Sequence, residues 1–120
     1  MNASSFVEVI RTVVYEPAVA STLETLRDGP VGRGPQQDLR QMAEWYNRLS
    51  DEDRERVGRV AEMSAFSAVF GFFAVLDGAR QIDRPNDRGQ ITLSYQKEGK
   101  NILINDPDGE VLHDLFKAGS

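Results

Sequence analysis

The feature that most constrains this chain is a long apolar segment with helical spacing between residues 51 and 80. At about 100° per residue, its second half separates into two uncharged faces. One face is rich in phenylalanine and comprises Phe66, Val69, Phe70, Phe72, Phe73 and Leu76. The other carries mostly small residues: Ser64, Ser67, Ala68, Gly71, Ala74, Val75 and Gly78. A helix without a polar side is typical of an interior, so this half is predicted to be buried all round.

The two faces predict different neighbours. Small side chains let another backbone come close, which favours a tight helix–helix contact inside the fold, with a ligand slot and a dimer seam as alternatives. The phenylalanine-rich face needs a cover over the second half only, because Glu52, Glu55, Arg59 and Glu62 make the same side of the first half polar. We expect the C-terminal hairpin to be that cover, with the preceding helices on the other side.

Two helices are predicted before residue 30. Phe6, Val9 and Val13 recur at helical spacing, and Ser4 or Ser5 can cap the helix that contains them. Pro17 suits the first turn of a second helix, which Asp28 and Gly29 end. The glycine- and proline-rich segment 29–35 then reads as a loop.

A third helix is predicted from about Pro35 to Arg48, and Ser50 caps the fourth, since carboxylates follow it in the positive first turn. Alternating apolar residues in 90–96 and 101–105, joined by a glycine-containing turn, predict an antiparallel hairpin. Residues 110–117 favour a short last helix. We therefore predict an α+β fold of about four helices around a buried central helix, with a C-terminal β-hairpin and a short final helix.

Composition limits the chemistry. The 120 residues fit a single domain, 1–120. The chain has no cysteine and one histidine, which excludes disulfides, thiolate sites and a histidine-cluster metal site, so we predict neither metal nor cofactor. The net charge of −5, with acidic and basic residues interleaved, argues against nucleic acid and anionic membranes and favours a protein partner. A homodimer is kept as an alternative.

We also expect a cytoplasmic location. The first residues lack the charged and apolar regions of a secretion signal. The most apolar stretch, 65–76, is too short to span a bilayer.

Two groups of residues suggest a calcium site and a catalytic pair, but the spacing of the residues favours neither. Asp106 and Asp108 resemble part of a calcium loop, but the glycine and glutamate positions do not fit, and Asp-Pro-Asp-Gly is a good turn. His113 and Asp114 suggest a catalytic pair, but adjacent helical residues point about 100° apart, so Asp114 is badly placed to orient the ring. We interpret His113 as a residue near a helix C-terminus, where the dipole favours it.

Four other residues are binding candidates. Asp77 and Arg80 end the phenylalanine-rich face, and a carboxylate there needs partners. We predict that Asp77 is a latch joining the helix end to the hairpin, with Arg80 as a partner; the alternative is a functional pair at a cleft mouth. Trp45 and Tyr46 suggest an aromatic platform, although core anchor plus rim is the favoured interpretation.

Three segments carry a resemblance: WYNRLS at 45–50, FGFFAVLDGAR at 70–80 and NDPDGEVLHDLF at 105–116. Together they resemble a family of small bacterial proteins with no assigned activity, over roughly the last two-thirds of the chain. The resemblance implies a bacterial, cytoplasmic setting, in which such proteins can lie among toxin–immunity neighbours, and it brings no catalytic residues.

The favoured function is a non-enzymatic protein-binding module, an immunity-like inhibitor. The alternatives are a small hydrolase or nuclease using Asp106, Asp108 or His113, and a small-ligand sensor using the small-residue face.

Overall fold

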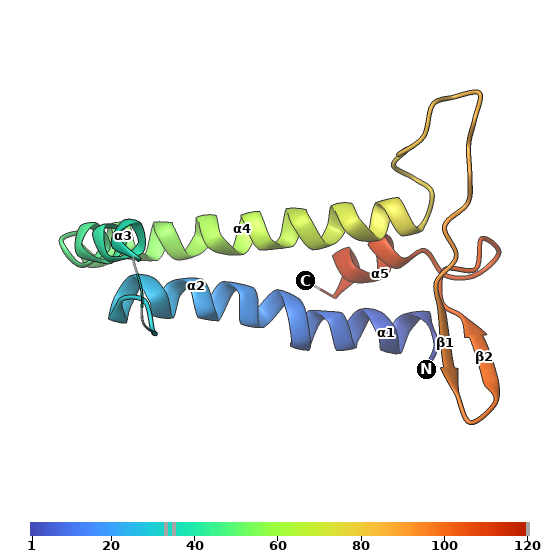
Figure 1. The fold of residues 1–120 in the computed structure, drawn as a ribbon, viewed down its shortest axis with the longest axis horizontal. Helices are drawn as coiled ribbons and strands as arrows, with labels where there is room; N and C mark the ends of the chain where they lie inside the picture. Colours follow the sequence, from blue (N-terminus) through green and yellow to red (C-terminus); the bar gives the residue numbers. More distant parts are fainter. Residues whose placement is uncertain (33, 35, 120) are drawn as a thin grey trace. The chain divides into compact units, whose positions relative to one another are not determined.

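The computed structural model describes residues 1–32, 34 and 36–119. Figure 1 shows helices and one β-hairpin, so the predicted α+β class is confirmed. The helical elements are α1 (Ala3–Ile10), a π-helical turn η1 (Arg11–Tyr15), α2 (Glu16–Asp28), α3 (Gln37–Asn47), α4 (Asp51–Leu76) and α5 (Leu112–Ala118). The strands are β1 (Ser94–Lys97) and β2 (Lys100–Leu103). The predicted start of the third helix, Pro35, lies outside the described residues.

The chain forms two compact units. One contains Met1–Val14 and Ser67–Ser120, and the other is Tyr15–Phe66. We call them the terminal unit and the middle unit. The prediction of one domain stays a prediction.

Helix α1 begins at Ala3, two or three residues earlier than a cap at Ser4 or Ser5 would place it. Asn2 is the cap: its Oδ1 accepts from Ser5 N at 2.9 Å, and Ser5 Oγ accepts from Asn2 N at 2.9 Å. This reciprocal arrangement is a capping box with Ser5 in the third helical position. The predicted cap at Ser4 or Ser5 is therefore wrong, and Ser5 is instead the partner of Asn2 in the capping box.

Pro17 lies in the first turn of α2, as predicted, but no break separates α2 from α1. Proline has no N–H to donate to the carbonyl four residues earlier, which disturbs an α-helix. Here the π-helical turn at Arg11–Tyr15 directly precedes α2. A widened turn is one way for a helix to absorb such a defect, so the chain continues helically.

Four aromatic and aliphatic side chains form the centre of the terminal unit. Phe73 of α4, Val7 of α1, and Leu112 and Phe116 of α5 are fully buried. The Phe73 ring lies 5.5 Å from that of Phe116 between centroids. Figure 1 shows α5, in red, beside the end of α4. Helices α1 and α5 therefore cover the phenylalanine-rich face, and the prediction that the hairpin covers it is wrong.

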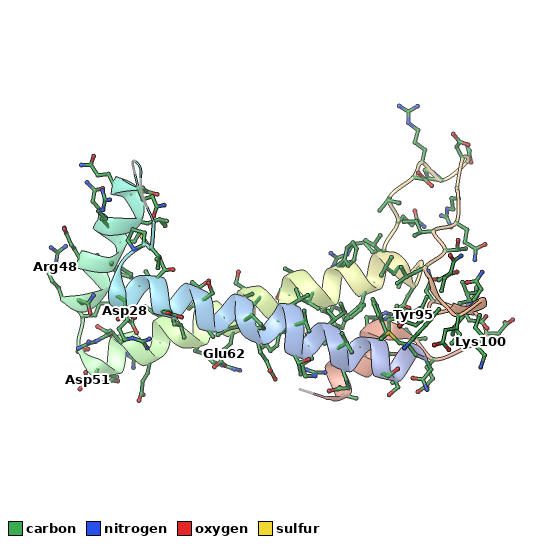
Figure 2. All side chains as sticks on the ribbon, turned by 60° about the horizontal axis from the view of Figure 1, so that its bottom comes forward. Asp28, Arg48, Asp51, Glu62, Tyr95 and Lys100 are labelled. Carbon is green, nitrogen blue, oxygen red and sulfur yellow. The ribbon has the colours of Figure 1, made fainter. Side chains whose placement is uncertain are left out.

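The hairpin is short and open. Its strands pair antiparallel from Ser94–Leu103 to Lys97–Lys100. Only Tyr95 among the strand residues is half-buried, and Figure 2 shows the side chains around the hairpin, with Tyr95 and Lys100 labelled. Four-residue strands offer too little apolar surface to cover a helix, which explains why the longer helical surfaces take that place.

The second half of α4 is not buried all round. Gly71, Phe73, Ala74 and Leu76 are buried, but Phe72 is 64% exposed, and Ser64, Ser67 and Ala68 are also exposed. The neighbours of α4 thus leave one apolar side open. With 26 residues and a mean hydropathy of 1.5 over its best 18-residue window, α4 is long and apolar enough to cross a membrane by length and composition, although a core helix of a soluble protein meets the same criterion.

In the middle unit, the side chain of Asn47 binds the carbonyl groups at the end of α2. Its Nδ2 lies within hydrogen-bond distance of the carbonyl oxygens of Leu26 (3.2 Å), Arg27 (3.1 Å) and Ala43 (2.9 Å). The first two belong to the last turn of α2, where carbonyls lack helical partners. Leu26 and Ala43 are buried beside this junction.

The start of α4 matches its prediction. Ser50 Oγ accepts from Asp53 N at 3.1 Å, and Arg56 bridges Glu52 and Asp53 at 2.7 and 3.1 Å. The predicted cap is therefore present, and exposed ion pairs follow it in the first turns of the helix.

Replacing Ser50 by alanine is expected to lower the free energy of unfolding by about 1 kcal/mol, because the cap acceptor is lost. Urea denaturation gives this value from the shift in midpoint. Thr is the matched control at this position, since it keeps the hydroxyl; a Ser50→Thr variant as unstable as Ser50→Ala would contradict the capping role.

Candidate functional site

The candidate site lies at the C-terminal end of α4, where Asp77 follows the last helical residue. The Asp77 side chain is only 7% exposed. Its Oδ1 accepts from Leu112 N at 3.0 Å, and its Oδ2 accepts from His113 N at 2.9 Å and lies 2.6 Å from His113 Nδ1. All three interactions run to the start of α5.

Asp77 is thus bonded as a latch, but its partner differs from the prediction. The predicted partners were Arg80 and the hairpin, whereas these bonds reach α5, 35 residues on. The reason lies in α5 itself. Its own cap position holds Val111, which has no side-chain acceptor, so the free N–H groups of the first turn take the Asp77 carboxylate instead. The negative charge also suits the positive end of the helix.

Arg11 holds the other end of α5. Its Nη2 donates to the carbonyl oxygen of Phe116 at 2.7 Å, and its guanidinium carbon lies 4.6 Å from the centre of the Phe116 ring. The residue is buried, with Glu8 Oε1 3.4 Å from its Nε. A seven-residue helix is thereby held by an anion at its N-terminus and a cation at its C-terminus, the order that the helix dipole favours. Arg11 was not among the predicted site residues, because the carbonyl that it binds lies 105 residues further along the chain.

His113 is oriented by Asp77, not by its neighbour. Its ring packs edge-on against Phe70, with 5.3 Å between centroids, and its side chain is 19% exposed. Nε2 lies 3.6 Å from Asp114 Oδ1, whose side chain is largely exposed. His113 is the second residue of α5, so its interpretation as a residue near a helix C-terminus is wrong. The expectation that Asp114 cannot be the orienting acid agrees with this geometry.

Asn105 is a second buried polar group that the sequence analysis did not select. Its Nδ2 donates to the carbonyl oxygens of Leu76 (2.7 Å) and Ile91 (2.8 Å), and its Oδ1 accepts from Leu93 N at 2.8 Å. One side chain thus joins the end of α4 to the segment before β1. The signal available in the sequence was a polar residue ending the alternation of 101–105, in a segment that also carries the family resemblance.

A cleft of about 250 Å³ opens beside these residues. It is lined by the end of α4, by two stretches of the following segment (80–83 and 88–91) with Gly78, and by Asn105 and Pro107. Asp77 and Arg80 both contribute to the lining, so the structure brings these two predicted residues to one cleft. No ion pair joins them among the residues that the structure describes.

Gly71 leaves room for the side chain of Arg80. A Cβ atom built at Gly71 would lie 2.5 Å from Nη1 and 3.2 Å from Cζ of Arg80, closer than packing allows. The guanidinium therefore lies directly over the helix at this glycine. The atoms nearest to Gly71 belong to Arg80, a residue of the following loop. At this position the small residue therefore accommodates a side chain, and not the second helix that the sequence had predicted.

The remaining candidates lie elsewhere. Asp106 Oδ1 accepts from Asp108 N at 3.0 Å, and Gly109 N donates to Asp106 O at 2.9 Å, which confirms the predicted turn. Within 1–32, 34 and 36–119, no three histidine or carboxylate residues are grouped as a metal site. Trp45 and Tyr46 belong to α3 in the middle unit; Trp45 is exposed, so the core-anchor interpretation fails for it.

No protein-family model, curated protein or solved structure matches the chain. The resemblance to small bacterial proteins therefore stays a prediction, and the function is argued from the residues alone.

Proposed function

We propose that the protein is a non-enzymatic protein-binding module of the bacterial cytoplasm, an immunity-like inhibitor, and that α3 carries its binding face. One observation supports this most directly. Leu39, Met42 and Trp45 follow one another along one side of α3 and are each 41–44% exposed. Exposed aromatic and methionine side chains are enriched at protein interfaces, and tryptophan is among the commonest residues to dominate binding energy.

The chemistry of this face indicates the kind of partner. Asp38 is exposed on α3 close to the apolar stripe, and the whole chain carries a net charge of −5. A partner with an apolar groove and basic residues around it would complement both features.

The hydrogen bonds that the candidate carboxylates already accept favour binding over catalysis. Both oxygens of Asp77 already accept hydrogen bonds from α5, and Asp106 serves its own turn. A carboxylate committed to backbone N–H groups is poorly placed to exchange protons with a substrate, since catalysis needs it within reach of the reacting group.

The test is site-specific photo-crosslinking in the native host. A benzophenone side chain at Met42 should give one discrete crosslinked protein, and the same group at exposed Val31 should not. The partner identified in this way is then titrated with purified variants. Trp45→Ala should weaken binding about tenfold or more, as expected for an interface anchor. Phe72→Ala, which removes an exposed aromatic ring from α4, should leave it unchanged. The reverse pattern would place the interface on α4 and contradict the role of α3.

A hydrolase remains the second candidate, because one observation favours it. A carboxylate 2.6 Å from His113 Nδ1 is the arrangement that orients a catalytic imidazole. The dyad still needs a nucleophile or a bound water at Nε2, and Asp114 Oδ1 lies 3.6 Å from that nitrogen.

We expect no hydrolysis of nucleic acid, phosphoester or carboxyl-ester substrates, with or without magnesium, manganese or calcium. The reason is that the Asp77 and Asp106 carboxylates accept hydrogen bonds within the fold. Turnover is measured with chromogenic and nucleic acid substrates at high protein concentration. Activity that His113→Gln abolishes, in a variant that remains folded, would overturn the binding-module proposal; loss in Asp106→Ala or Asp108→Ala would indicate metal-dependent chemistry at the turn.

A further inference from the structure

We infer that the cleft at the end of α4 binds a small monocarboxylate, and that the Arg80 guanidinium is its anchor. This site is independent of the α3 face. The cleft volume of about 250 Å³ is just below the range of roughly 300–1,000 Å³ that is usual for ligand pockets, so its ligand must be small.

Arg80 is the available charged group in this cleft. Its guanidinium has no hydrogen-bond or ion-pair partner among the residues that the structure describes. The second arginine of the lining, Arg88, faces the side-chain oxygen of Gln81 when that amide is oriented to satisfy both groups. A guanidinium binds a carboxylate through two parallel hydrogen bonds, which gives both energy and orientation.

The two carboxylates of the cleft are already engaged. Asp77 accepts from the start of α5, and Asp83 Oδ2 accepts from Gly89 N at 2.8 Å. Among the described residues, neither forms an ion pair with Arg80. Their charges still repel an incoming anion, and this repulsion grows with the charge that the anion carries. A singly charged carboxylate is consequently favoured over phosphate.

The Arg80 side chain already lies against α4 in the unliganded protein. Gly71 leaves no Cβ where the guanidinium lies, so the side chain rests on α4. Holding a flexible side chain in its binding position reduces the entropy lost on association. Beside it, Val75, Ile82 and Ile91 line the cleft and can contact a short apolar tail.

Binding is tested by nuclear magnetic resonance on the full chain, following the Arg80 side-chain Nε–H and the backbone amides of residues 77–91. Butyrate should produce saturable shifts at these positions. Butyramide, which has the same shape without the charge, and inorganic phosphate should bind at least about tenfold more weakly, the loss expected when a charged hydrogen-bonded pair is missing or opposed.

Matched variants distinguish binding at Arg80 from general attraction of an anion to the positively charged side chains of this segment. Arg80→Gln should weaken butyrate binding about tenfold or more, whereas Arg84→Gln, on the same segment but outside the cleft lining, should not change it. Gly71→Ala should also weaken binding, because the added methyl group displaces the guanidinium. If Arg80→Gln does not fold, Arg80→Lys replaces it and should show an intermediate loss, since it keeps the charge without the fork.

A second ligand identifies the source of the carboxylate. Glutamate blocked at both termini presents the group as a protein side chain does. Tighter binding of blocked glutamate than of butyrate would support the same site with a partner's acidic residue as occupant. No saturable shift with either ligand, or equal losses in Arg80→Gln and Arg84→Gln, would overturn the inference and leave the α3 proposal untouched.

Discussion

Replacing Asp77 by alanine is expected to lower the free energy of unfolding by about 2–4 kcal/mol, the range for losing a buried charged acceptor. The variant leaves the N–H groups of Leu112 and His113 without an acceptor at the start of α5. It also frees the His113 ring, which packs against Phe70. Because α5 supplies Phe116 and Leu112 to the centre of the terminal unit, loosening its start exposes the two most completely buried residues.

Urea denaturation measures the free energy of unfolding of the Asp77→Ala variant, and hydrogen exchange measures the protection of its α5 amides. Asp114→Ala is the matched control. It also removes a carboxylate near His113, but the Asp114 side chain is 73% exposed. It should change stability by less than about 0.5 kcal/mol, as surface substitutions usually do. Asp77→Asn should be intermediate, since the amide keeps one acceptor and turns a donor toward the remaining N–H groups. Equal stability of Asp77→Ala and the wild type would show that the latch does not hold α5.

Much of the fold could be predicted because its causes are local. The Ser50 cap, the turn at Asp106 and the end of α2 at Gly29 each depend on residues within one or two turns of the chain. The cap of α1 shows the limit of such reasoning. Asn2 and Ser5 form one reciprocal cap, and the local pattern identifies the serine more easily than the residue that faces it.

The covering of α4 could not be predicted because it is decided by competition between distant elements. The apolar alternation of the hairpin and the periodicity of α5 both offered a partner for the phenylalanine-rich face. The outcome depends on how much apolar surface each presents in three dimensions. Helix α5 presents two fully buried side chains, whereas each strand has only four residues and β2 is exposed throughout.

The candidate site shows the same division. The need of Asp77 for partners follows from its place at the end of an apolar stripe, and that prediction agrees with its three contacts. Which partners it finds depends on α5 lacking a cap of its own. Arg11 and Asn105 carried no comparable local signal: an arginine in a helix and an asparagine at a strand end are ordinary on a surface, and only the tertiary structure makes them buried.

Asn105 is the second position at which a large loss is expected. Asn105→Ala should lower the free energy of unfolding by about 3 kcal/mol, because buried groups that lose their partners cost about 1–3 kcal/mol each and partial hydration recovers some of this. The substitution leaves the carbonyl oxygens of Leu76 and Ile91 and the N–H of Leu93 without the bonds that Asn105 supplies. The segment before β1 then keeps one backbone bond near this point, from Ile104 N to Leu93 O at 2.7 Å.

The identity of the side chain at position 105 gives the sharper comparison. Asn105→Asp has nearly the same shape, but it replaces the donor to Leu76 and Ile91 with an oxygen and places a charge against two carbonyls. It should be at least as destabilising as alanine near neutral pH, and acidification should recover part of the loss, because a protonated aspartate donates one hydrogen bond. Asn101→Ala, at an exposed position of β2, is the control and should be nearly neutral. If Asn105→Asp were as stable as the wild type, the side chain would not be a donor to the end of α4, and the connection between α4 and the hairpin would have to rest on the backbone alone.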